Sequence, residues 1–94
     1  MRRLIWAEAF RRAFKRHVQQ RPELQLRVEK ALRLLEEDPF DPTLHSHKLK
    51  GKLAQLWACT VDYDSRILFM FLANPDTGEE AILLVSMGTH KEVY

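Results

Sequence analysis

The closing segment of the chain constrains its fold most. The segment from residue 81 begins as an uninterrupted apolar run, Ala-Ile-Leu-Leu-Val, which is typical of a strand buried on both faces. Gly88 ends the run, and a threonine, a histidine, a lysine and a terminal tyrosine follow it. We therefore expect a rigid strand that holds polar side chains at the edge of a sheet, supported by the rest of the fold.

The length and composition predict a single domain over residues 1–94, with 46% apolar residues to form one core. No apolar run approaches the roughly 20 residues of a membrane helix, and charged residues interrupt the N-terminus too early for a signal peptide. We expect a soluble cytoplasmic protein that does not bind membranes. Cys59 is the only cysteine, which excludes an internal disulfide and a thiolate metal cluster and favours simple packing.

The small net charge of +2 conceals a segregation of charges along the chain. Residues 1–21 carry seven Lys or Arg and one acidic residue, whereas residues 22–44 carry three basic and six acidic residues. Residues 45–52 carry three lysines, two histidines and no acid. The two basic segments either converge on one face that attracts a polyanion or form separate solvated surfaces.

The apolar periodicity predicts an α+β fold. A short strand is expected over residues 3–7, and helices over 8–19 and 22–37, where apolar residues recur every three or four positions. Residues 40–54 are expected to be an irregular loop. Three strands are predicted over residues 55–61, 66–73 and 80–87, and short turns should pair them as an antiparallel meander, with the middle strand central. The sequence leaves open where the first strand enters the sheet.

Four polar clusters fall at strand ends or in the loop. In a meander, Asp64, Arg66 and His90 lie at the same end of the sheet, whereas His47 reaches them only if its loop folds back. Two histidines near arginine and lysine suit metal-independent RNA cleavage, because imidazole exchanges protons near neutral pH and the cations bind phosphate. The candidate phosphate ligands are Arg66, Lys48, Lys50 and Lys52, and Tyr94 is a candidate for stacking on a base.

Each candidate also has a structural interpretation. Asp64 is typical of a turn, Arg66 suits an ion pair with Asp62 or Asp64, and the loop lysines suit a solvated surface. A zinc site formed by His45, His47 and His90 is a further alternative, although two histidines separated by one residue are a weak signal.

The blocks 47–51, 56–57, 63–69 and 88–94 together resemble the RelE/ParE toxin superfamily, and most closely its RelE/YafQ mRNA interferase branch. The Gly-Thr-His-Lys-Glu-Val-Tyr end is the most specific block, and the expected element order is similar to that fold. The resemblance implies that His47, Asp64 and His90 are catalytic, that Arg66 contacts phosphate and that Tyr94 is the family's terminal aromatic residue. It also implies a histidine where this chain has Thr60. Three alternatives follow: His45 substitutes for that histidine, the role of that histidine is dispensable here, or the activity is reduced.

The resemblance implies the toxin of a type II toxin–antitoxin pair, a ribosome-dependent mRNA endonuclease without a cofactor. The expected partners are a cognate antitoxin, the ribosome and mRNA, and no direct DNA binding is expected without the antitoxin. Two alternatives remain open: a ParE-like gyrase inhibitor, which would not need the histidines, and a remnant that only binds its antitoxin.

Overall fold

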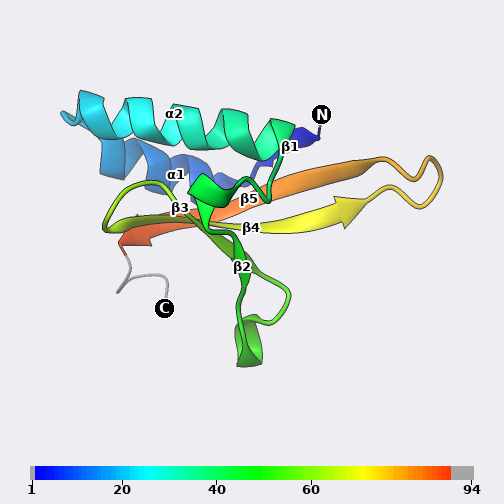
Figure 1. Cartoon of the computed structure of the whole chain (residues 1–94). Helices are drawn as coiled ribbons and strands as arrows, with labels where there is room; N and C mark the ends of the chain where they lie inside the picture. The colour runs from blue at the N-terminus through cyan, green and yellow to red at the C-terminus, as the bar shows by residue number, and fades with distance from the viewer. Residues whose placement is uncertain (1, 90–94) are drawn as a thin grey trace.

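The computed structural model describes residues 2–89, with two helices and five strands (Figure 1). Strand β1 spans Arg3–Trp6, helix α1 spans Glu8–Val18 and helix α2 spans Pro22–Glu37. Strands β2, β3, β4 and β5 span His47–Lys48, Trp57–Thr60, Ser65–Ala73 and Glu80–Thr89. Two short 3-10 helices flank β2: η1 at Pro42–Leu44 and η2 at Gly51–Leu53.

Local sequence explains where the helices begin and end. Helix α2 begins at Pro22, whose fixed φ and missing N–H suit a first turn, and Glu23 lies at the positive end of the helix dipole. It ends before Asp38, because a residue that precedes proline avoids helical φ and ψ. Helix α1 has Glu8 in its first turn and basic residues in its last turn, as its dipole favours.

The five strands form one sheet in the order β1-β5-β4-β3-β2. Strands β2 to β5 pair antiparallel with their neighbours, and β1 pairs parallel with β5, with Leu4 opposite Ile82. A parallel neighbour requires a crossover connection, which α1 and α2 provide. The structure therefore confirms the α+β fold and the meander, places β4 at the centre, and inserts the first strand beside β5.

Both helices cover one face of the sheet and leave the other face open (Figure 1). The main core lies between the two helices and the sheet. It includes Phe10, Val28, Leu35, Phe69 and Leu84, each with 0% exposure. A second, smaller cluster lies apart from this core and consists of Leu49, Ala58 and Leu68, with Leu56 and Val85 packed against it. Neither helix is both long enough and apolar enough to cross a membrane.

Two sequence predictions were wrong. Residues 40–54 are not irregular throughout, because they contain η1, β2 and η2. A strand of two residues is too short to show alternation, so the pairing with β3 was not visible in the sequence. The closing strand is also not buried on both faces: Ile82 and Leu84 are buried but Leu83 and Val85 are only partly so, since the helices cover one face.

Candidate functional site

The β2–β3 hairpin brings His47 to the sheet. His47 pairs with Ala58 and Lys48 pairs with Trp57, and the Leu49 N–H donates to the Leu56 carbonyl at 2.9 Å. The segment after β2 projects away from the helices, past the open face (Figure 1). The fold-back that His47 requires is therefore present.

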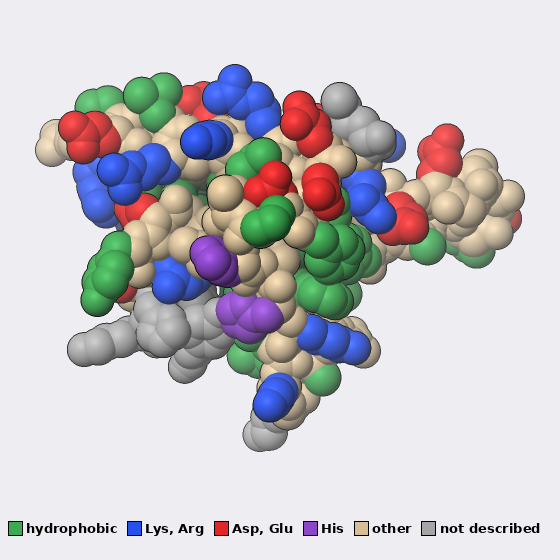
Figure 2. Space-filling view, viewed as in Figure 1, with side chains coloured by type: hydrophobic (Ala, Val, Ile, Leu, Met, Phe, Trp, Pro, Cys, Tyr) green, Lys and Arg blue, Asp and Glu red, His purple; other side chains and the backbone are tan. Residues whose placement is uncertain are grey.

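The strand register places several polar residues on the open face. Residues directly opposite each other in antiparallel strands share a face, and so do residues two apart within a strand. His47 opposes Ala58, Thr60 opposes Arg66, and Arg66 also opposes Gly88. His47 and Arg66 therefore share the open face, on strands two spacings apart, or roughly 10 Å. Figure 2 shows two histidine side chains next to each other near the centre of this view, with Lys or Arg side chains on both sides of them.

The turn between β3 and β4 is organised by Asp62. Its Oδ1 accepts hydrogen bonds from the N–H groups of Asp64 at 3.0 Å and Ser65 at 2.7 Å. This Asx-type turn lets Val61 N–H donate to the Ser65 carbonyl at 2.9 Å and starts β4 at Ser65. Asp62 was not among the predicted site residues, although an aspartate three residues before a serine is the sequence signal for such a turn.

The carboxylate of Asp62 remains charged in this environment. Partial burial alone would raise its pKa, but hydrogen bonds from the Ser65 and Asp64 N–H groups and from the Ser65 hydroxyl outweigh that effect. The positive charge of Arg27 on α2 acts in the same direction, and its Nη1 lies 4.0 Å from Asp62 Oδ2. The pKa of Asp62 therefore lies below its ordinary value, and the turn is tied to α2.

The same turn holds Arg66. Its Nη1 donates to the carbonyls of Asp62 at 2.9 Å, Tyr63 at 3.3 Å and Ser65 at 3.1 Å. Within residues 2–89 these are its only hydrogen bonds, and they engage one edge of the guanidinium group. The opposite edge still has donors for a planar anion such as phosphate.

The other predicted residues occupy different places. Asp64 is exposed in the turn, and Lys48 and Lys50 are exposed before and after Leu49. Lys48 opposes Trp57, whose side chain packs against the helix-side core, so this lysine does not share the face of His47. Lys52 lies in η2, and its side chain is outside what the structure describes. His90 and Tyr94 lie outside the described residues.

His47 has a defined local environment. Its Nδ1 lies 3.1 Å from the carbonyl oxygen of His45. His45 itself has a left-handed backbone with φ 49° and ends η1. If the β2–β3 ladder continued by two residues beyond His47 and Ala58, His45 would oppose Thr60. The left-handed conformation of His45 interrupts the ladder, so Thr60 has no strand partner in β2.

Neither a reactive thiol nor a cluster of metal ligands is present among residues 2–89. Burial raises the pKa of the Cys59 thiol to about 12, against smaller opposing effects of the Ile67 backbone and the Arg66 charge. Among residues 2–89, no three His, Cys, Asp or Glu side chains are grouped so that they could hold a metal ion. The zinc alternative includes His90 and so falls outside this range.

The fold is that of RelE/ParE-superfamily toxins. YafQ from E. coli strain BL21(DE3) matches with a TM-score of 0.78 at 14% identity, over 100% of this chain and 99% of that chain. The YoeB/ParE toxin from Agrobacterium tumefaciens matches with a TM-score of 0.77 at 15% identity, over 94% and 98%. The E. coli DinJ–YafQ toxin–antitoxin complex matches with a TM-score of 0.75 at 15% identity, over 99% and 97%.

The family follows from the sequence. The profile of the family described as "Bacterial toxin of type II toxin-antitoxin system, YafQ" matches residues 2–94. The chain therefore belongs to the YafQ family of type II toxins, which confirms the predicted resemblance. No curated protein sequence matches the chain.

Proposed function

We propose that this toxin is an mRNA endonuclease that acts on the ribosome and arrests translation. The observation that carries the proposal is the β2–β3 pairing, which brings His47 to the face of the sheet that also carries Arg66. A proton-exchanging imidazole and a bidentate phosphate ligand on one open face suit phosphodiester cleavage. The family match favours this activity over gyrase inhibition.

The proposed roles follow from residue chemistry. His47 and His90 share acid–base work on the 2′-hydroxyl and the leaving 5′-oxygen, and Asp64 orients one of them or accepts a proton. Arg66 binds the scissile phosphate through the guanidinium edge that the turn carbonyls leave exposed. Lys48, Lys50 and Lys52 add positive charge around the β2–η2 segment, Lys48 from the face opposite that of His47, and Tyr94 stacks on a base. No cofactor takes part in these roles.

His45 is the proposed substitute for the histidine that the family has at the position of Thr60. The short chain distance supports this role, because His45 lies two residues before His47 and Thr60 lies two residues after Ala58, the strand partner of His47. A threonine hydroxyl is a poor general acid or base, whereas the exposed imidazole of His45 is of the residue type most often used for proton transfer.

The proposed partner is a small antitoxin encoded next to the toxin, as DinJ accompanies YafQ in the similar complex. A disordered segment with acidic and apolar residues would order on the toxin and cover its basic surfaces. We further propose that residues 1–94 act as a single domain in the cytoplasm, where the ribosome and mRNA are available.

Induced expression without antitoxin tests this function. We expect translation arrest and cleavage of mRNA on ribosomes for the wild type, and loss of both for His90→Ala and for His47→Ala. His17→Ala serves as the control, because His17 lies on α1 on the other side of the sheet. Equal arrest by wild type and His90→Ala would remove His90 from the mechanism. DNA breaks without mRNA cleavage would favour the gyrase inhibitor, and normal growth would favour the antitoxin-binding remnant.

A further inference from the structure

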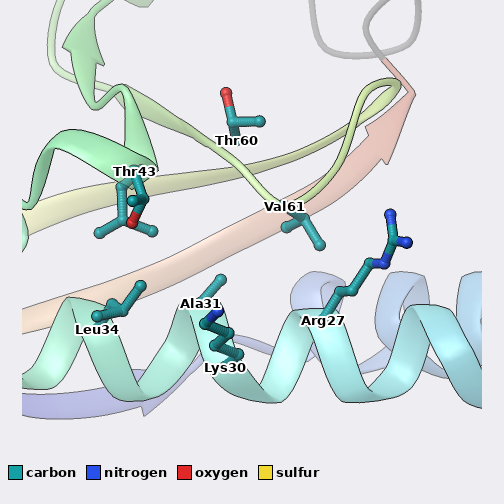
Figure 3. Close-up of a pocket in the computed structure, with 8 residues that line it drawn as sticks. Arg27, Lys30, Ala31, Leu34, Thr43, Thr60 and Val61 are labelled. Atoms are coloured by element: carbon teal, nitrogen blue, oxygen red, sulfur yellow. The ribbon is translucent and has the colours of Figure 1, made fainter.

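A pocket of about 260 Å³ lies between α2 and the end of β3 (Figure 3). Its apolar lining consists of Ala31, Leu34, Leu44 and Val61, and its polar lining consists of Arg27, Lys30, Thr43 and Thr60. Strand β3 separates this pocket from the open face. In Figure 3, Val61 points toward α2 while Thr60 points away from it, so one strand end borders both surfaces.

The pocket carries two cations that lack close ion pairs. Arg27 is 60% exposed, and its one ion pair with another of residues 2–89, Asp62, is long at 4.0 Å. Lys30 is exposed one helical turn later and forms no ion pair within residues 2–89. Asp41, a carboxylate that interacts electrostatically with Lys30, is already engaged: the Thr43 hydroxyl donates to its Oδ1 at 2.6 Å and the Thr43 N–H at 2.9 Å.

Charged side chains at the rim of the pocket affect one another. Hydrogen bonds from the Thr43 hydroxyl and N–H lower the pKa of Asp41, and the charge of Lys30 contributes in the same direction. Asp41 and Asp62 therefore stay ionised near the two cations. Because both carboxylates accept backbone or hydroxyl hydrogen bonds from their own turns, Arg27 and Lys30 retain donors for a further anion.

The strand edge adds a backbone donor. Val61 N–H donates to the Ser65 carbonyl, so the alternation of an antiparallel ladder turns the N–H and C=O of Thr60 away from β4. Strand β2 begins at His47 opposite Ala58 and therefore does not cover Thr60. The N–H of Thr60 therefore has no strand partner at this edge, which η1 also contacts, and it is a donor for an anion that the guanidinium of Arg27 and the ammonium of Lys30 attract.

We propose that this pocket binds a backbone phosphate of the RNA strand, next to the phosphate that Arg66 holds. The inference rests on the proposed endonuclease function. Thr60 lies directly opposite Arg66, so an RNA strand that crosses the open face reaches the pocket by passing over the edge of β3. The pocket then selects an extended single strand, because a rigid duplex could not bend around that edge.

The test measures how the affinity for a 2′-O-methyl RNA oligonucleotide depends on salt, and compares the wild type with variants of Lys30 and Lys15. The oligonucleotide cannot be cleaved at a methylated 2′-oxygen. We expect Lys30→Gln to weaken binding several-fold and to reduce the slope of log K against log salt by about 0.7, which corresponds to one phosphate contact on a single strand. Lys30→Arg should restore both values. Lys15→Gln, which removes an exposed lysine from α1, should leave the slope unchanged.

Three outcomes would overturn the inference. The first is an equal salt slope for Lys30→Gln and Lys15→Gln, and the second is saturation of the pocket by inorganic phosphate without any effect on RNA affinity. The third is that Lys30→Gln loses affinity for a glutamate-rich peptide but not for RNA. The first leaves no site, the second assigns a free-phosphate site and the third assigns a protein partner. Ribosomal mRNA cleavage by the wild type is measured separately, so failure of the endonuclease function is distinguished from failure of the pocket.

Discussion

Thr60 lies directly opposite Arg66 across the β3–β4 ladder, on the face of the sheet that the helices leave open. The pair joins Thr60, where the resemblance implies a histidine, to the arginine whose guanidinium donates to three carbonyls of the β3–β4 turn. Substitutions of Thr60, Arg66 and Asp62 separate the effects of this region on activity from its effects on stability.

Thr60→Val should change the rate of mRNA cleavage by less than about threefold. Valine keeps the shape of threonine, and a threonine hydroxyl does not exchange protons near neutral pH, so general acid–base catalysis loses nothing. The measurement is cleavage of mRNA on purified ribosomes. His45→Ala provides the comparison, with an expected loss of about 100-fold if His45 takes the acid or base role. A large loss in Thr60→Val with little change in His45→Ala would reverse the assignment.

Arg66→Ala should lower the cleavage rate by about 100- to 1000-fold, as expected for the loss of a positioned phosphate ligand. Arg66→Lys should remain well below the wild type, because an ammonium group cannot bind the turn carbonyls and a phosphate in one plane. Arg12→Ala, an exposed arginine on α1, is the charge-matched control. Wild-type cleavage by Arg66→Lys would show that positive charge alone suffices.

Asp62→Ala should destabilise the protein by about 1–3 kcal/mol, because two backbone N–H groups lose their acceptor. The pKa of Asp62 is lowered by folding, so its contribution to stability is present above the unfolded-state pKa of about 4 and is lost as the pH falls through the folded-state value. Urea denaturation from pH 6 to pH 3 measures both effects. Asp62→Asn should lose less stability over this range than the wild type, and Asp76→Asn, in the β4–β5 turn, should follow the wild type.

Phe69→Ala should destabilise the protein by about 3–5 kcal/mol, because Phe69 has 0% exposure in the main core. Phe40→Ala should cost about 1–2 kcal/mol. Phe40 is 55% exposed, and its contribution is limited to ring contacts with Trp57 at 5.5 Å and Phe71 at 5.8 Å. Denaturant titrations of both variants test the ranking, and a larger loss for Phe40→Ala would contradict the burial argument.

Cys59 should react slowly with thiol reagents in the native protein at pH 8. The thiol is fully buried, and burial raises its pKa to about 12, so almost no thiolate forms. Labelling should become fast in concentrated urea, where the chain unfolds. Fast labelling of the native protein would indicate that the edge of β3 opens easily.

The sequence by itself determined the elements with strong local signals. Apolar periodicity predicted α1 and α2, Pro22 and Asp38-Pro39 predicted the limits of α2, and the apolar run over residues 66–73 predicted the central strand. These signals depend on residues that are neighbours along the chain. The motif blocks likewise sufficed for the family, because its recognition needs residue order rather than contacts.

Only the tertiary structure decided the rest. The closing strand continues through Thr89 because Ser65 and Arg66 on β4 pair with Thr89 and Gly88. The short strand β2 exists because β3 pairs with it, and that pairing moves His47 from a loop to the open face. Likewise, Asp62 organises the turn that holds Arg66 through its hydrogen bonds, and the pocket lined by Arg27 and Lys30 lies where α2 meets the end of β3. Strand partners and surfaces shared between elements depend on long-range contacts, which local periodicity does not encode.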